Sequence, residues 1–116
     1  MDVKSFYEAV GGNYQSALAI MMNDMLIVRM LAKFMDNNCC QAIIDAYDKK
    51  DYQTVFVNAH SLKGVVGNLA LTPLFESASI ITEATRNGAT PNIDDEVNKL
   101  KERYSLIIEN FKKFNN

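Results

Sequence analysis

The spacing of apolar residues constrains this chain more than any other feature, because it repeats at three and four residues along most of the sequence. Within residues 51–71 the pattern is carried by Phe56, Ala59, Leu62, Val66 and Leu69. This period is that of an amphipathic helix, whereas a half-buried strand needs strict alternation of apolar and polar residues. No sustained alternation is present, so the sequence predicts an all-α protein.

Signals for helix starts and ends divide the chain into short and long helices. We predict helices over residues 2–10, 13–21, 24–35, 41–49, 51–71, 72–86 and 94–113, with N-caps at Asn13, Asp51 and Thr72 and stops at Gly11-Gly12 and Asn87-Gly88. Short connections between long helices favour antiparallel neighbours. The expected architecture is an up-down antiparallel four-helix bundle with additional short N-terminal helices, forming a single domain over residues 1–116.

Composition and charge exclude several classes of protein. The formal net charge is -2 and no basic stripe is present, which argues against nucleic-acid binding. No apolar run approaches the roughly 18 residues of a membrane span, and no signal peptide opens the sequence, so we expect a cytoplasmic protein with no membrane partner. The adjacent Cys39 and Cys40 have the wrong spacing for a Cys-x-x-Cys metal site and are expected to be reduced thiols near a helix start.

Two glycines interrupt the predicted helix over residues 51–71. Gly64 and Gly67 each cost about 1 kcal/mol relative to alanine in a helix interior. With Lys63 they lie on the face of His60, the only histidine of the chain, at i+3, i+4 and i+7. Lys63 offers a cation near the imidazole and Gly64 leaves space beside it. This arrangement suits a nitrogen atom that must carry an anionic group.

The run Ala59-His60-Ser61-Leu62-Lys63-Gly64, followed by Gly67 and Leu69-Ala70, resembles the histidine phosphotransfer (HPt) domains of two-component phosphorelays. The resemblance covers nearly the whole chain. The family often has Leu-Gly where this chain has Leu69-Ala70, a change that we expect to matter little because alanine is also small. Many members carry a glutamine where Thr82 falls.

The resemblance implies a phosphohistidine carrier, with His60 as phosphoryl acceptor assisted by Lys63 and Gly64. Its partners would be receiver domains of response regulators or hybrid sensor kinases, and the reacting aspartate and Mg²⁺ would belong to the receiver. No phosphate-binding loop of the Gly-x-x-x-x-Gly-Lys type and no carboxylate cluster is recognisable. We therefore expect no intrinsic cofactor, no metal and no self-contained catalytic site. We also expect the protein to be a monomer.

Counting from the turn between two antiparallel helices predicts the far wall of this site. If the turn centres near Leu71, His60 lies about eleven residues before it and Thr82 about eleven after it. The candidates on the second helix are Ser79, Thr82, Glu83 and Arg86, with Arg86 as a second cation. Gly67 supports the site on the first helix.

Two other functions stay open on the sequence alone. One is an adaptor that binds receiver domains without accepting phosphate, although the retained His60 and Gly64 argue against it. The other is a metal- or haem-binding bundle, which would need more ligands than one histidine and two adjacent cysteines provide. We expect most of the methionines between positions 21 and 35 to fill the core, while the resemblance leaves open a docking surface that includes Met21, Met22 or Met25.

Overall fold

The computed structural model describes residues 1–115, which fold into seven α-helices and two short 3₁₀ turns with no strand in that range. The elements are α1 (Val3–Val10), α2 (Tyr14–Met21), α3 (Asp24–Met35), α4 (Cys39–Asp48), α5 (Tyr52–Asn68), α6 (Thr72–Ala84), η1 (Arg86–Gly88), α7 (Asp94–Phe111) and η2 (Lys112–Asn115). The predicted all-α class is confirmed.

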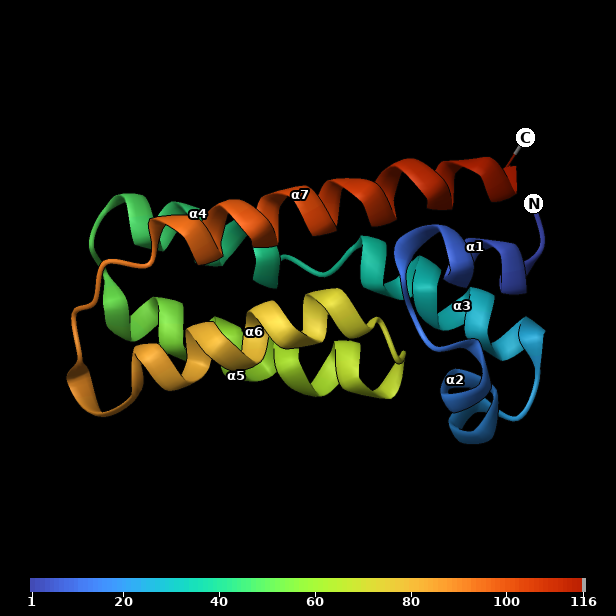
Figure 1. Ribbon diagram of the computed structural model, residues 1–116, viewed down its shortest axis with the longest axis horizontal. Helices are drawn as coiled ribbons and strands as arrows, with labels where there is room; N and C mark the ends of the chain where they lie inside the picture. Colours follow the sequence, from blue (N-terminus) through green and yellow to red (C-terminus); the bar gives the residue numbers. More distant parts are fainter. Residues whose placement is uncertain (116) are drawn as a thin grey trace.

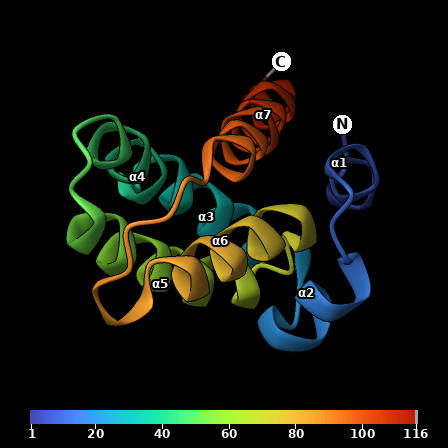
Figure 2. The same ribbon diagram turned by 60° about the vertical axis from the view of Figure 1, so that its left-hand side comes forward.

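Four helices form an up-down bundle, and three short helices close one end of it. Helices α4, α5, α6 and α7 run in alternating directions, with α5 and α6 side by side as a hairpin (Figures 1 and 2). Helices α1, α2 and α3 lie at the end where α5 turns into α6 (Figure 1). The long α7 crosses both parts, because it packs on α4 and α6 and also on α1.

The helix starts follow the capping chemistry of the sequence. The Asn13 side chain accepts a hydrogen bond from the Ser16 amide at 3.0 Å, and Asp51 accepts one from the Thr54 amide at 3.2 Å. Each satisfies an amide that has no partner inside the helix. The two predicted N-caps are confirmed, and Gly11 ends α1 in the left-handed conformation with φ 72°.

Several predicted boundaries are wrong. Helix α5 ends at Asn68 and not at residue 71, and α6 ends at Ala84 and not at residue 86. Helix α4 begins at Cys39 rather than at residue 41, so both cysteines lie in its first turn, with Cys40 buried. Thr72 is not the cap of α6, because Leu71 occupies the cap position and makes no side-chain hydrogen bond. Lys112 and Lys113 follow α7 in the 3₁₀ turn instead of closing it.

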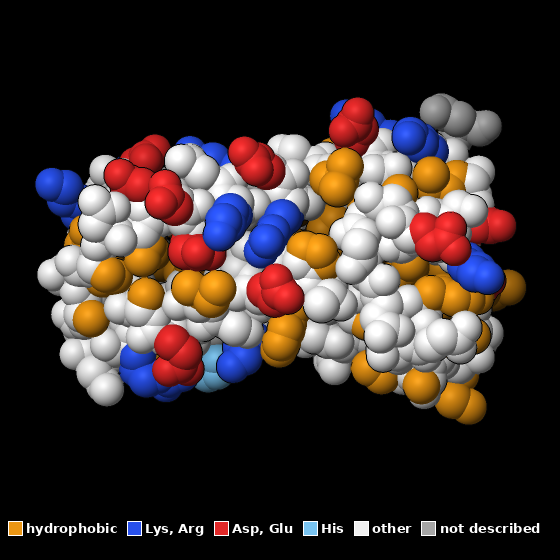
Figure 3. Space-filling view, viewed as in Figure 1, with side chains coloured by type: hydrophobic (Ala, Val, Ile, Leu, Met, Phe, Trp, Pro, Cys, Tyr) orange, Lys and Arg blue, Asp and Glu red, His pale blue; other side chains and the backbone are white. Residues whose placement is uncertain are grey.

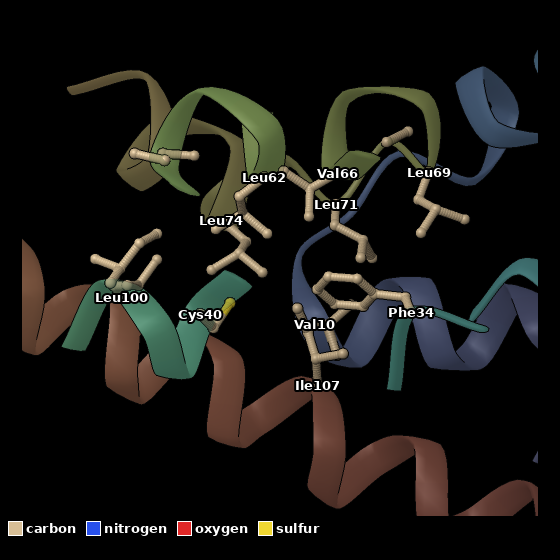
Figure 4. Packing of buried hydrophobic residues seen from close by; sticks show 14 of the residues in the cluster. Val10, Phe34, Cys40, Leu62, Val66, Leu69, Leu71, Leu74, Leu100 and Ile107 are labelled. Carbon is tan, nitrogen blue, oxygen red and sulfur yellow. The ribbon is translucent and has the colours of Figure 1, made fainter. Parts of the chain in front are cut away.

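The core is a continuous apolar cluster contributed by all the long helices. Leu62 and Val66 of α5 point toward Leu74, Leu71 and Phe34, and α7 supplies Leu100 and Ile107 on the opposite side (Figure 4). These side chains are almost fully buried. The inward face of α5 is therefore committed to the core, which leaves its opposite face on the surface.

The turn between α5 and α6 has a specific backbone geometry. The Leu71 amide donates to the Val66 carbonyl at 3.0 Å and the Ala70 amide to the Gly67 carbonyl at 3.1 Å, which is a Schellman motif with Ala70 in the left-handed position. Ala70 has φ 53°, a conformation that favours glycine. The expectation that alanine matters little here, which rested on its size, overlooked this backbone requirement.

The N-terminal helices hold this turn through its carbonyl groups. The buried Tyr7 hydroxyl donates to the Leu69 carbonyl at 2.6 Å, and the Asn13 amide donates to the Ala70 carbonyl at 2.9 Å. Burial raises the pKa of Tyr7, so this phenol stays protonated and remains a donor. A side chain at Gly12 would lie 2.9 Å from the Ala70 oxygen, so glycine permits the close approach.

None of the helices in residues 1–115 is long and apolar enough to cross a membrane. Of the methionines that the sequence left open, Met22 is 79% and Met25 73% exposed, next to the turn between α2 and α3. Met21 is half-buried against the core. Met21 therefore contributes to the interior, whereas Met22 and Met25 lie on the surface.

Candidate functional site

His60 lies in the middle of α5, on the face directed away from the core. Its neighbours Ala59 and Leu62 are buried, whereas His60 itself is exposed. The space-filling view shows the histidine, coloured pale blue, at the surface beside basic side chains (Figure 3). The helical period therefore places the ring where a partner can reach it.

A shallow depression of about 360 Å³ surrounds the imidazole. It is lined by His60, Lys63, Gly64, Gly67, Asn68 and Phe75. The four α5 residues that the sequence placed on one face are thus brought together. Asn68 and Phe75 were not predicted as site residues, although Asn68 continues the α5 face and Phe75 is the residue that faces Gly67 across the hairpin.

The two glycines of α5 have different surroundings. A Cβ atom built on Gly64 meets no atom within 4 Å, so that position opens onto free space. A Cβ atom on Gly67 would lie 3.2 Å from Cε1 and 3.3 Å from Cδ1 of Phe75. Gly64 therefore leaves room next to His60, and Gly67 lets the ring of Phe75 approach α5.

The contacts between α5 and α6 establish which residues face His60. Gly67 meets Phe75 near the turn, and Phe56 meets Arg86 at the far end of the hairpin. His60 lies between Phe56 and Gly67, so the segment 79–83 of α6 lies opposite it. Counting from Leu71 therefore predicted correctly which part of α6 lies opposite His60.

The prediction that Thr82 lines the site is wrong. Thr82 is 0% exposed, and its hydroxyl donates to the Ala78 carbonyl at 2.6 Å within its own helix. It lies at the level of His60 but points into the bundle, so its hydroxyl does not reach the surface depression. Ser79 is half-buried and its hydroxyl donates to the Phe75 carbonyl at 2.8 Å.

The Arg86 side chain is held near the site by contacts with Glu83 and Phe56. Its guanidinium donates two hydrogen bonds to Glu83, at 2.8 and 3.1 Å, and its Cζ lies 5.3 Å from the centre of the Phe56 ring. The Phe56 ring in turn lies 5.9 Å from the His60 ring, with 39° between the two planes. The guanidinium, the phenyl ring and the imidazole thus lie in a row of consecutive contacts, with the two rings tilted relative to each other. Phe56 is one helical turn before His60, a spacing that could have revealed this contact from the sequence.

Glu83 places an acidic side chain next to Arg86 on the exposed side of α6. The hydrogen bonds from Arg86 hold the pKa of Glu83 below its ordinary value, and the charges of Arg86 and Lys63 add to this effect. The carboxylate is therefore ionised at neutral pH. It lies within the electrostatic field of Lys63.

The site contains a nucleophilic nitrogen, cations and open space, but no cluster of ligands. Among residues 1–115, no group of three or more His, Cys, Asp or Glu side chains lies close enough to hold a metal ion. An exposed imidazole can bond to an electrophile through the lone pair of its unprotonated nitrogen, and a neighbouring ammonium can stabilise oxygen anions on that group.

Comparison with known families shows to which family the chain belongs. The family model of the Hpt domain matches residues 29–110, a span that contains α4 to α6, most of α3 and almost all of α7. The chain belongs to the Hpt domain family. Hpt domains are phosphocarriers rather than catalysts, and they act with the receiver domains of response regulators in phosphorelays. No curated protein and no solved structure matches the chain significantly.

Proposed function

We propose that His60 is the phosphoryl-carrying residue of this domain and exchanges its phosphoryl group with an aspartate of a receiver domain. The observation that supports this most directly is the open space at Gly64, where a Cβ atom would have no neighbour within 4 Å, beside an exposed imidazole. A phosphoryl group and the partner that delivers it both need this space. The half-buried Lys63 borders the same depression.

The proposed transfer needs little from the carrier beyond position and charge. The lone pair of the unprotonated ring nitrogen attacks the phosphorus of an aspartyl phosphate, so a nitrogen–phosphorus bond forms while the phosphorus–oxygen bond breaks. The receiver carboxylate leaves with the bonding electron pair, and the reverse transfer follows the same path. Negative charge on the equatorial oxygens is stabilised by Lys63 and by a metal ion that we assign to the receiver.

The remaining features follow from the same role. We propose a cytoplasmic monomer without an intrinsic cofactor, because the His60 face has to stay open for one receiver at a time. Sedimentation at micromolar concentration tests the monomer, and a stable dimer that buries His60 would contradict it.

The central experiment is transfer of a radiolabelled phosphoryl group from a phosphorylated receiver domain to the purified protein. The wild type should gain a label that is labile in acid and stable in alkali, as expected for phosphohistidine. His60→Gln should gain none, while its helical circular-dichroism spectrum is unchanged because the side chain is exposed. Label on the His60→Gln variant, or a wild type that binds the receiver without accepting label, would refute the proposal.

A further inference from the structure

The Glu83 carboxylate is an exposed negative charge on α6, at the level of His60 on the facing helix. Segment 79–83 of α6 lies opposite His60, and within it Thr82 points inward whereas Glu83 is exposed on the surface side. The pKa of Glu83 is lowered mainly by the hydrogen bond from Arg86, with a smaller contribution from the charge of Lys63, which agrees with this placement. Phosphorylation of the imidazole would add roughly two negative charges to the same surface.

We infer that Glu83 sets the phosphoryl-transfer equilibrium of His60 by destabilising the phosphohistidine and thereby favouring release of the phosphoryl group to the receiver. The inference rests on the proposed function of His60. Glu83 need not touch the phosphoryl group, because charges on facing helices interact without contact, with screening by salt and, here, with partial compensation by Arg86. It acts as a tuning residue and not as a catalytic one.

Arg86 limits the effect of Glu83 and holds it in place. The two hydrogen bonds between their side chains fix the carboxylate, and the guanidinium is itself held against the Phe56 ring that contacts His60. Loss of Glu83 would leave a cation facing the phosphoryl group. Loss of Arg86 would leave an unpaired carboxylate. The two substitutions should therefore shift the equilibrium in opposite directions.

The experiment measures the ratio of phosphorylated to unphosphorylated protein at equilibrium with one phosphorylated receiver domain. The concentrations are kept too low for the complex to be populated, so that the ratio reports on the phosphoryl group and not on docking. Glu83→Gln should raise the equilibrium constant for phosphohistidine formation about three- to tenfold at low salt, and less near 0.15 M, where the Debye length is about 8 Å. Arg86→Gln should lower it by a comparable factor.

Glu76→Gln is the matched control. It removes the same charge from the same helix, but Glu76 lies 4.0 Å from Arg103 of α7 instead of facing His60. Its equilibrium constant should equal that of the wild type. Thermal melts should show that all three variants fold, since the three altered side chains are themselves exposed and surface ion pairs contribute little to stability.

Three outcomes would overturn the inference: an unchanged constant in Glu83→Gln, an equal rise in Glu76→Gln, or shifts of the same sign in Glu83→Gln and Arg86→Gln. In each of them the wild type still exchanges label with the receiver, so the proposed function of His60 would stand. A wild type that takes up no label would instead refute that function.

Discussion

Gly64 gives the sharpest test of the site, because the structure separates its role from that of Gly67 on the same helix. Gly64→Ala adds a methyl group where no atom lies within 4 Å. No contact is therefore strained by the substitution. What remains is the backbone effect, since alanine is the better helix former and loses less conformational freedom on folding.

The expected magnitude follows from that difference. Gly64→Ala should raise the free energy of unfolding by about 0.8–1 kcal/mol, which corresponds to roughly 4 °C in the melting temperature of a domain of this size. Gly67→Ala has the same helix propensity gain, but its methyl group would meet Phe75 at 3.2 Å. We expect it to be at least about 1 kcal/mol less stable than Gly64→Ala, because a half-buried ring must move.

Thermal melts and urea titrations of both alanine variants give this difference, and a phosphotransfer assay completes the test. Gly64→Gln should fold, because glutamine is a good helix former, yet it should block transfer since its side chain leans toward the ring of His60. A Gly64→Ala variant that is destabilised as much as Gly67→Ala would refute the reasoning. So would a Gly64→Gln variant that folds and transfers at the wild-type rate.

Two further predictions concern Ala70 and Lys63. Ala70→Gly should raise the free energy of unfolding by about 1 kcal/mol in urea titrations, because the left-handed φ of 53° is unfavourable for a residue with a Cβ; no gain would mean that the turn carries no strain. Lys63→Ala should shorten the lifetime of the labelled protein or slow label transfer at an unchanged melting temperature, and Lys63→Arg should restore most of the rate because it keeps the charge. A large fall in melting temperature with unchanged transfer would make Lys63 a structural residue.

The parts of the fold that the sequence predicted are those governed by local chemistry. Asn13 and Asp51 cap helices because their side chains reach amides three residues ahead, and Gly11 ends α1 because it tolerates a positive φ. The shared face of His60, Lys63 and Gly64 likewise needs only the period of a helix. Such features do not depend on how helices are packed.

The parts that the sequence missed depend on how each helix is rotated in the bundle. Counting residues from the turn placed Thr82 at the right level, but one position along a helix is a rotation of about 100°. That rotation separates the buried Thr82 from the exposed Glu83. The left-handed Ala70 was missed for another reason, since size alone was compared and the backbone angle was not considered.

The attachment of the N-terminal helices to the hairpin has a consequence for how this protein can change over evolution. The Tyr7 hydroxyl and the Asn13 amide both bind main-chain carbonyls, at Leu69 and Ala70. A main-chain acceptor is present whatever side chain the position carries. Helices α1 and α2, which lie outside the span matched by the family model, are thus joined to the family core by contacts that substitutions at these two positions would not erase. Substitutions at positions 69 and 70 should therefore leave this attachment in place, whereas a substitution of Tyr7, which supplies one donor and packs in the shared core, would weaken it.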